Sequence, residues 1–487
     1  MGGMSAVPTQ GTAQSTVPVP FSPALRRAIG VIMIGASLSF LDSTVVNVAL
    51  DTVAADLAVP LTEVQWTVTA YLLAFAAVIP VTAWAAQRLG AARLYLVSLL
   101  VFTLGSACCA LSDSIGQLVA SRALQGLGGG AIMPVGTIIW TRMADRSQMA
   151  RVMSMVGIPI VLAPMIGPLI GGLLVKGAGW QSIFWINIPL GLVGAVLARL
   201  LLPRDDGSEA GPLDVPGLVL AAGGLVGLTY GLADIGTRAE ATARSIAVLV
   251  TAVVFLVLFV VRSLRVPHPL LDMRLYANRL FSAAALTMFS LGVALFGGMI
   301  LLPLYFQIVR GEDVVSTGLL LVPSGVGALA ANRLAAPLTD KLGGGTTALL
   351  GGLIAAVCTI PFLFLTAGTS YPLLALAMAT RGAGIGLSLT PVMTSAYRTL
   401  PAQKIKDATP QLNVLQRVGG SIGTAVLTIV LSHQLAGRTR PSGRAQAFGD
   451  TFGWVIVAAV LAIVPTILLF VTERAQRAAS TAHEKHS

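Results

Sequence analysis

One carboxylate, Asp42, interrupts an apolar segment of the chain, LSFLDSTVVNVAL (residues 38–50). An ionisable side chain inside a membrane span is costly unless it is paired or solvated, so it is a functional candidate by default. A small, polar stripe with a four-residue spacing runs beside it, formed by Gly35, Ser39, Ser43 and Asn47. On a helix this spacing places the stripe on one face, which would contact protein or a watery cavity. We therefore predict a functional role for Asp42, with a static ion pair that fixes helix packing as the alternative. The cavity-lining candidates on this face are Ser39, Ser43 and Asn47.

Three arginines also fall inside apolar segments and are candidate partners of this carboxylate. Arg122 comes early in LVASRALQGLGGGAIMPVG and is expected at the same depth as Asp42. Arg417 and Arg381 are further possible ion-pair partners, and Gln125 is a candidate to line the cavity. A conformational change that alters both the ion pairing and the hydration of a carboxylate changes its pKa. Such a change binds and releases a proton, which is what coupling transport to a proton gradient requires.

The glycine-rich segments do not indicate an enzyme. GLGGGA (126–131) matches a loose dinucleotide fingerprint and GGSIG (419–423) a nucleophile-elbow pattern, but no strand is expected before either. Both are better interpreted as small-residue faces for close helix packing. The sequence contains neither a GxxxxGK[ST] phosphate loop nor HExxH, and its three cysteines form no CxxC pair. We therefore expect no direct use of ATP, no cofactor, no metal site and no disulfide framework.

A proline-rich segment, GIPIVLAPMIGPLIGG (157–172), is a candidate gating element. Its three prolines predict a kinked helix, and its glycines let a neighbouring backbone approach closely. A bent helix without further role is one interpretation. We favour a mobile gating helix, whose gating positions are Gly167, Pro168, Gly171 and Gly172.

The composition predicts that most of the chain lies in a membrane. Of its 487 residues, 55% are hydrophobic and 10% are charged, and the mean hydropathy is +0.85, whereas soluble domains carry about 25% charged residues. The net charge of +11 does not indicate nucleic-acid binding, because the basic residues stand singly between apolar blocks. The excess of basic residues is instead explained by membrane topology.

Fourteen apolar stretches are long enough to cross about 30 Å of hydrocarbon. The predicted spans are 27–50, 64–86, 94–112, 117–140, 149–175, 181–202, 215–234, 244–263, 281–309, 316–339, 346–367, 371–397, 411–434 and 451–472. Because the runs are continuous rather than alternating, they predict helices and not a barrel. The expected fold class is an all-α integral membrane protein.

Orientation follows from the distribution of lysine and arginine. With both termini inside, inner loops and tails hold 21 of the 31 basic residues and outer loops hold 7. We predict a multi-pass protein of the cytoplasmic membrane with both termini in the cytoplasm. Its predicted parts are a disordered N-terminal tail (1–26), a six-helix bundle (27–202), a two-helix insert with its linkers (203–280), a second six-helix bundle (281–472) and a C-terminal tail (473–487).

An internal repeat supports this division. AWAAQRLGAA (83–92) follows the second span and APLTDKLGGG (336–345) follows the tenth, which is the second span of the later bundle. Duplicated halves with a site at their interface are a recurrent plan among secondary transporters. The predicted inner-loop gate is formed by Arg88, Gly90, Asp340 and Lys341.

Four segments together resemble the fourteen-span drug:proton antiporters of the major facilitator superfamily. LDSTVVNVAL resembles their first-span signature, and LVASRALQGLGGGA resembles the fourth-span pattern L-x-x-x-R-x-x-Q-G-x-G-x-A, with Gly130 in place of the final alanine. APMIGPLIGG resembles the fifth-span motif G-x-x-x-G-P-x-x-G-G, with Ala163 in place of the first glycine, and GWQSIFWINIPLG resembles the start of the sixth span. The resemblance covers residues 27–472. It implies a major facilitator fold of two six-helix bundles plus two inserted helices, working by alternating access.

The resemblance also implies roles for individual residues. Asp42 would be the coupling or substrate-sensing carboxylate, Arg122 its proton-relay partner, and the glycines of the fifth span the gating hinge. Spans 1, 4, 9 and 12 would line the cavity. Two departures stand out: Gln87 replaces the acid of the usual inner-loop motif, so that Asp340 is left to carry the inner-gate salt bridge, and Asp51 stands where a proline is usual.

The leading functional hypothesis is proton-coupled export of lipophilic, cationic or amphipathic small molecules such as drugs or antibiotics. Export or flipping of lipids is an alternative of the same mechanical class, and a non-transporting membrane sensor is an alternative of another class. A sugar facilitator is disfavoured by the sparse polar side chains near the midplane. The expected partners are small lipophilic substrates, protons and membrane lipids, with no nucleic acid, and the chain is expected to be a monomer.

Overall fold

The computed structural model describes residues 20–145, 148–156, 158–203, 207, 211–238, 242–398 and 400–484, and every regular element within these ranges is helical. The helices, with η for short 3-10 helices, are α1 (Pro23–Asp56), α2 (Leu61–Val78), η1 (Ile79–Val81), α3 (Thr82–Leu89), α4 (Ala91–Ala110), α5 (Ile115–Met143), α6 (Met149–Val156), α7 (Ile158–Ala178), α8 (Ser182–Trp185), α9 (Asn187–Leu201), α10 (Val215–Arg238), α11 (Ala243–Arg265), η2 (Met273–Ala277), α12 (Arg279–Met299), α13 (Leu301–Ile308), α14 (Val314–Leu342), α15 (Gly344–Val357), η3 (Ile360–Phe364), α16 (Tyr371–Gly386), α17 (Leu389–Arg398), α18 (Ala402–Leu435) and α19 (Pro441–Glu484). The predicted all-α membrane class is confirmed.

Thirteen helical stretches in the described part of the chain are long and apolar enough to cross a membrane. The remaining predicted span, 149–175, corresponds to α6 and α7, and Gly157 between them lies outside the described residues. With 21 residues, α7 alone is about 31 Å long, which is enough to cross the hydrocarbon layer. The protein is therefore a multi-pass membrane protein.

Several spans predicted as continuous are divided. The second span breaks into α2, η1 and α3 around Pro80, which lacks a backbone N–H to continue the helical ladder. The ninth divides into α12 and α13, and the twelfth into α16 and α17. Helix starts are satisfied locally: the Oγ of Ser22 accepts from the N–H of Leu25, and the Oδ1 of Asp313 accepts from the N–H of Ser316.

Glycines bring the helices of each bundle close together. A Cβ on Gly126 would lie 2.4 Å from the carbonyl oxygen of Tyr71 on α2, and one on Gly128 would lie 2.4 Å from the N of Phe102 on α4. Similarly, a Cβ on Gly423 of α18 would lie 2.2 Å from the carbonyl oxygen of Val293 on α12. Both glycine-rich segments therefore act as packing faces, which is the interpretation favoured from their sequence.

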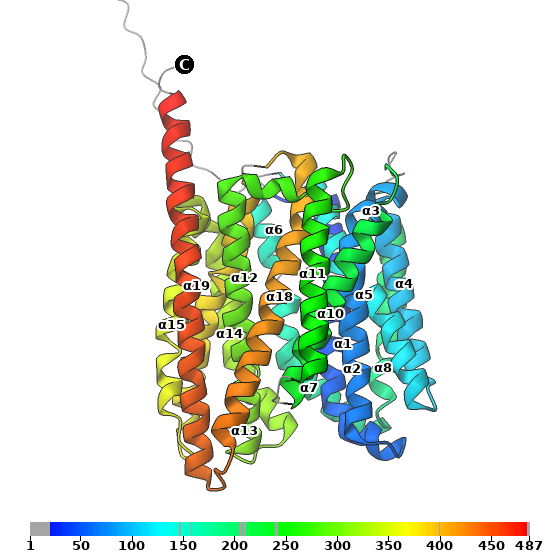
Figure 1. Ribbon diagram of the computed structural model, residues 1–487, viewed down its shortest axis with the longest axis vertical. Coiled ribbons are helices and arrows are strands. Elements are labelled where there is room, and N and C mark those ends of the chain that lie inside the picture. Colours follow the sequence, from blue (N-terminus) through cyan, green and yellow to red (C-terminus); the bar gives the residue numbers. More distant parts are fainter. Residues whose placement is uncertain are drawn as a thin grey trace, which may run out of the picture.

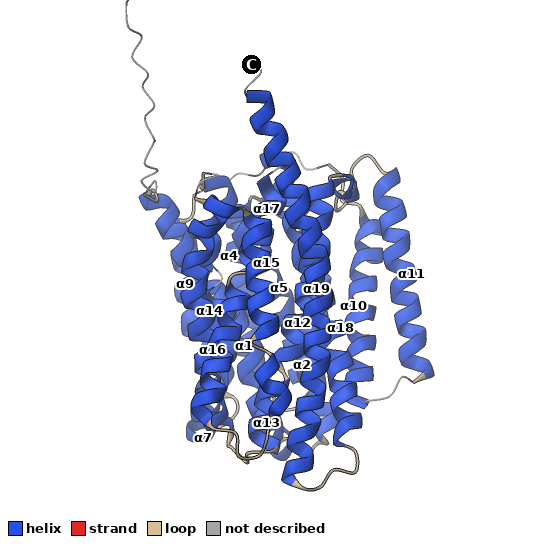
Figure 2. Ribbon diagram, turned by 90° about the vertical axis from the view of Figure 1, so that its left-hand side faces the viewer, coloured by secondary structure: helices blue, strands red, loops and turns tan. Residues whose placement is uncertain are grey.

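The two inserted helices lie at the side of the bundle. Figure 2 shows α11 at its edge, with α10 between α11 and α18. In contacts, α10 packs against α2 of the first bundle and α18 of the second, and Tyr230 of α10 stacks on Trp66 of α2 with ring centroids 5.8 Å apart. In an 18-residue apolar stretch of α11 only 17% is buried, whereas the buried share of the corresponding stretch of α5 is 78%. The insert thus covers the seam between α2 and α18 and presents α11 to lipid.

The helices at the two ends of the chain can be compared with the predicted tails. Residues 1–19 of the predicted N-terminal tail lie outside the described residues, and α1 begins at Pro23. Residues 473–484, predicted as part of a tail, continue α19, which projects beyond the bundle at the top of Figure 1. The last predicted span therefore ends well before its helix does.

Candidate functional site

Asp42 lies at the centre of a buried polar network in the first bundle. Nη1 of Arg122, on α5, donates to Oδ2 of Asp42, on α1, over 2.6 Å. Asp42 is 3% exposed and Arg122 is 1% exposed. Removing one partner of such a buried pair costs about 3–5 kcal/mol, because the other charge is left uncompensated.

Two amides complete the shell of Asp42. Nε2 of Gln125 donates to its Oδ1 over 2.8 Å, and Nδ2 of Asn187, at the start of α9, donates to the same oxygen over 2.9 Å. Both amides also donate to Oγ of Ser106 on α4, over 2.6 and 3.0 Å. Asp42 thus accepts three hydrogen bonds, an arrangement that suits the ionised carboxylate.

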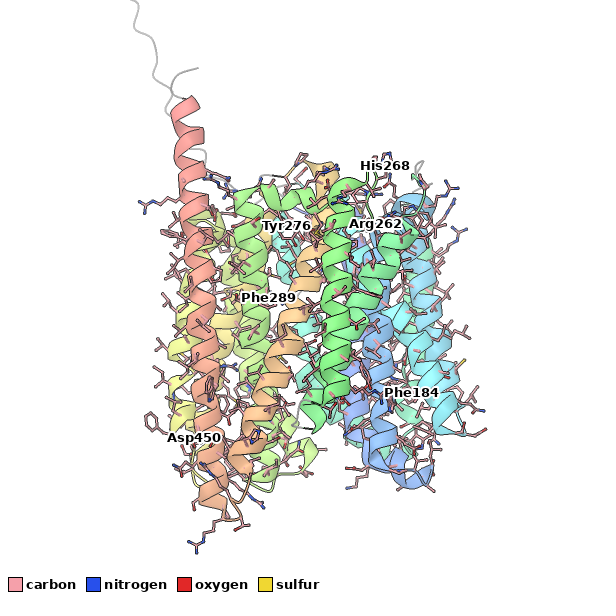
Figure 3. All side chains as sticks on the ribbon, viewed as in Figure 1. Phe184, Arg262, His268, Tyr276, Phe289 and Asp450 are labelled. Carbon is pink, nitrogen blue, oxygen red and sulfur yellow. The ribbon has the colours of Figure 1, made fainter. Side chains whose placement is uncertain are left out.

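Arg122 is held on all sides. Its Nη1 also donates to Oε1 of Gln125 over 2.6 Å, and its Nε donates to the carbonyl oxygen of Thr67 over 3.2 Å. The guanidinium lies over the ring of Tyr71, 4.2 Å from its centroid, and 5.7 Å from that of Phe184. In Figure 3, Phe184 lies in the half of the molecule away from the end where α19 projects. The network is therefore off-centre along the bundle axis.

The polar stripe of α1 is divided between the protein interior and the surface. The hydroxyl of Ser39 is buried, lies 3.3 Å from that of Tyr71, and donates to the carbonyl oxygen of Gly129. Ser43 is half-buried and donates to the carbonyl oxygen of Phe40. Asn47 is exposed and donates only to the carbonyl oxygen of Ser43. Ser39 and Gln125 therefore belong to buried contacts around the network, whereas Asn47 is exposed.

Neither of the other two arginines predicted within spans, Arg417 and Arg381, contacts Asp42. The guanidinium of Arg417, on α18, lies over the ring of Phe75 of α2, 4.0 Å from its centroid, and so joins the two bundles. Arg381, on α16, donates from Nε to Oγ1 of Thr359 over 3.2 Å. In this structure the partner of Asp42 is Arg122, because α1 and α5 belong to the same bundle.

Comparison with known proteins gives the family. The family model described as Major Facilitator Superfamily matches residues 32–424. The chain belongs to the major facilitator superfamily. This transporter is 36% identical over 452 residues to a multidrug resistance protein B homolog of Mycobacterium tuberculosis, covering 88% of this chain and 83% of that protein. It is 31% identical over 435 residues to a methylenomycin A resistance protein of Streptomyces coelicolor, covering 87% and 90%.

A solved structure has the same fold. The crystal structure of the human organic anion transporter MFSD10 (TETRAN) aligns with a TM-score of 0.63, covering 92% of this chain and all of that one. The sequence identity is 15%, so this likeness concerns the fold alone. The predicted major facilitator fold is thus confirmed.

The fifth-span glycines form a close joint in the transporter. A Cβ on Gly167 would lie 2.0 Å from Oγ1 of Thr44 on α1, and one on Gly171 would lie 3.1 Å from Cγ1 of Val45. A Cβ on Gly172 would lie 2.9 Å from Cγ2 of Val315 on α14, in the other bundle. Pro168 lies between them in α7. The motif therefore sits where α7 contacts both α1 and α14.

The two loops predicted to form the inner gate share one backbone feature. Gly90 and Gly343 have φ values of +85° and +100° and precede α4 and α15, a conformation that glycine adopts without steric cost. Arg88 lies in the last turn of the short helix α3, two residues before its capping glycine. The repeat seen in the sequence therefore corresponds to two turns of the same conformation.

The acid that accepts hydrogen bonds from the second loop is Glu473, whereas the inner-loop motif predicted Asp340. Asp340 and Lys341 are exposed, and Asp340 forms no ion pair within the described residues. Instead Glu473 of α19, 5% exposed, accepts from the N–H groups of Gly344 (3.2 Å) and Gly345 (2.6 Å) at the start of α15. Its carboxylate also accepts from Oγ of Ser395 (3.0 Å) and Nη1 of Arg398 (3.1 Å). A helix N-terminus and a cation together favour a carboxylate at this point.

Sequence reasoning did not assign roles to Asn187, Ser106 or Tyr71. Asn187 falls in GWQSIFWINIPLG, where an amide in an otherwise apolar segment is a detectable signal. Ser106 and Tyr71 give no such signal, because their positions depend on how α4 and α2 are rotated toward α5. The spacing of Arg122 and Gln125, three residues apart on a helix, does place both on one face.

Proposed function

We propose that this transporter is a proton-coupled antiporter that exports lipophilic, cationic or amphipathic small molecules from the cytoplasm by alternating access, with both termini cytoplasmic. The observation that carries the proposal is the buried Asp42–Arg122 pair and its two amides. The relatives named for multidrug and methylenomycin A resistance support drug or antibiotic efflux.

The network offers a reason why protonation would change the structure. Ionised Asp42 receives three donors and needs no acceptor. A protonated carboxyl carries an O–H that requires an acceptor. The Oε1 of Gln125 can be that acceptor once the amide rotates. Rotation would turn its NH₂ group toward Nη1 of Arg122, which is also a donor. Protonation of Asp42 is therefore expected to release Arg122.

All members of the network lie in the first bundle, on α1, α2, α4, α5 and α9. Rocking of one bundle against the other leaves these contacts intact, so we expect coupling to depend on which side gives protons and substrate access to Asp42. A cationic substrate and a proton would compete for this one carboxylate. That competition is the physical basis of exchange.

The test is transport of ethidium, a lipophilic cation, into inside-out proteoliposomes with an imposed pH gradient. We expect Asp42→Asn to lose gradient-driven accumulation at least 100-fold. An unchanged size-exclusion profile of the purified variant separates loss of coupling from loss of folding. Asp51→Asn is the matched control, because Asp51 lies on the same helix and is exposed. Undiminished gradient-driven accumulation by Asp42→Asn would overturn Asp42 as the coupling group.

A further inference from the structure

The second bundle contains a buried arginine for which the described residues supply no counter-ion. Arg381 is 5% exposed, and in the described part of the chain its one hydrogen bond runs from Nε to Oγ1 of Thr359. The four other N–H groups of its guanidinium make no hydrogen bond within the described residues. Buried charges in proteins are ordinarily paired, so Arg381 differs from Arg122, which occupies the fourth span of the first bundle and has three partners.

No carboxylate of the second bundle can reach this depth. Arg381 comes ten residues after Tyr371, the first residue of α16, or about 15 Å along the helix, which is about half of the hydrocarbon thickness. The acids between residues 281 and 472 are Glu312, Asp313, Asp340, Asp407 and Asp450, and all five lie outside the predicted spans. Asp42 is already paired with Arg122.

Arg381 borders a pocket enclosed by α12, α15, α16 and α19. Its walls are largely apolar and include Leu295, Ala355, Ile385 and Ile463. Three hydroxyl side chains also line it, but each donates to a nearby carbonyl oxygen: Thr359 to Ala355, Ser388 to Gly384 and Thr466 to Ala462. The unsatisfied polar group of the pocket is therefore the guanidinium.

Two glycines leave room in the pocket, one for the guanidinium and one beside it. A Cβ on Gly298 would lie 2.4 Å from Nη2 of Arg381, so a side chain there would displace it. A Cβ on Gly352, in the wall formed by α15, would meet nothing within 4 Å. The neighbouring residues Leu353 and Val464 are 42% and 64% exposed. The rim of the pocket therefore continues into the lipid-facing surfaces of α15 and α19.

We propose that this pocket binds a single-chain anionic amphiphile of the fatty-acid class, with its carboxylate on Arg381 and its chain between α15 and α19. A carboxylate offers two acceptor oxygens to the paired N–H groups of a guanidinium. The apolar walls suit an alkyl chain, whereas the phosphate of a two-chain lipid stays in the headgroup layer, about 15 Å from this depth. The site is separate from Asp42 and does not depend on the proposed antiport.

The test is equilibrium binding of radiolabelled oleate to the purified full chain in a neutral detergent. We expect saturable binding that falls at least tenfold in Arg381→Met and remains within threefold of wild type in Arg381→Lys. Gly352→Leu, which fills the pocket without changing its charge, should also weaken binding at least tenfold. Gly30→Leu is its matched control, because Gly30 of α1 also has open space around it.

Competing ligands test whether the pocket recognises both the carboxylate and the alkyl chain. Oleyl alcohol, with the same chain and no charge, should compete at least tenfold more weakly than unlabelled oleate, and acetate and chloride should not compete at equal concentration. Equal binding by wild type and Arg381→Met, or equal competition by oleyl alcohol, would overturn the proposal. Competition by acetate or chloride would also overturn it, because the pocket would then select a small anion.

Discussion

Among single residues, the two buried arginines of the fourth spans are stabilised in different ways. Arg122 has a carboxylate at 2.6 Å, a glutamine oxygen, a backbone carbonyl and the face of Tyr71. Arg381 has one threonine hydroxyl. In the proposed antiport, neutralising the carboxylate of Asp42 would remove the strongest of the contacts that hold Arg122.

The amide of Asn187 gives the first prediction. Asn187→Leu removes one donor to Oδ1 of Asp42 and one to Ser106, and a hydrogen bond to a charged group is worth about 1.5–3 kcal/mol. We expect a loss of stability of that size, measured by thermal unfolding in detergent, together with reduced gradient-driven transport. Asn47→Leu, which alters an exposed amide bonded only within α1, should change stability by less than about 0.5 kcal/mol. Equal losses in the two variants would show that the amide contact to Asp42 is not stabilising.

A second prediction concerns pH and a loop outside the spans. Burial disfavours the charged form of Asp272, but hydrogen bonds from Nζ of Lys404 and from the N–H of Arg274, with the charges of both residues, hold the pKa of Asp272 below its ordinary 3.8. A carboxyl with a lowered folded-state pKa contributes stability above 3.8, and this contribution is lost as the pH falls through the folded-state pKa. Lys404→Met should therefore unfold at a lower temperature than wild type at neutral pH, with the difference shrinking below about pH 4. The effect is small, because Lys404 is 45% exposed. A difference between the two proteins that does not change with pH would contradict this account.

At the scale of helices, the sequence predicted where spans occur better than where they break. Continuous apolar runs identify helices, because a backbone in lipid must satisfy its own polar groups. The division of the second span around Pro80 follows from proline chemistry and could have been predicted from the sequence. The divisions between α12 and α13 and between α16 and α17 depend on packing against other helices, which hydropathy does not report.

For the candidate site, the sequence predicted which residues are unusual but not how they are arranged. The acid of α1 and the arginine and glutamine of α5 were identified because charged and amide groups are rare in spans. Their geometry, and the presence of Asn187 in it, required the relative rotation of four helices. The position of Glu473 was missed because the predicted span ended at residue 472, so the acid that caps α15 was assigned to a tail.

The start of α15 gives a prediction at this scale. Glu473→Gln removes the charge that pairs with Arg398 and caps Gly344 and Gly345, so we expect a loss of about 1.5–3 kcal/mol of stability. Asp340→Asn, at an exposed acid without an ion pair, should stay within about 0.5 kcal/mol. Chemical unfolding of the purified variants measures both values. A larger loss for Asp340→Asn than for Glu473→Gln would mean that the acid predicted from the inner-loop motif holds the loop.

For the molecule as a whole, the proposed orientation can be tested with two exposed positions at opposite ends. His268 lies at the upper end of Figure 3, beside Arg262, whereas Thr439 lies in the connection from α18 to α19, near Asp450 at the lower end. In a background with Cys108, Cys109 and Cys358 replaced by alanine, a membrane-impermeant maleimide should label Thr439→Cys in intact cells. It should label His268→Cys only after the cells are opened. Labelling with the opposite preference would invert the proposed topology.

The length of α19 has a practical consequence for imaging. This helix has 44 residues, about 66 Å, so about half of it extends beyond the hydrocarbon layer of about 30 Å. A 50.1 kDa protein whose described elements are nearly all inside a micelle offers few features for aligning particle images in electron cryomicroscopy. A small folded domain fused in helical register to α19 would stand clear of the detergent at a fixed angle. Such a fusion would provide the alignment marker needed to record the transporter in its other conformations.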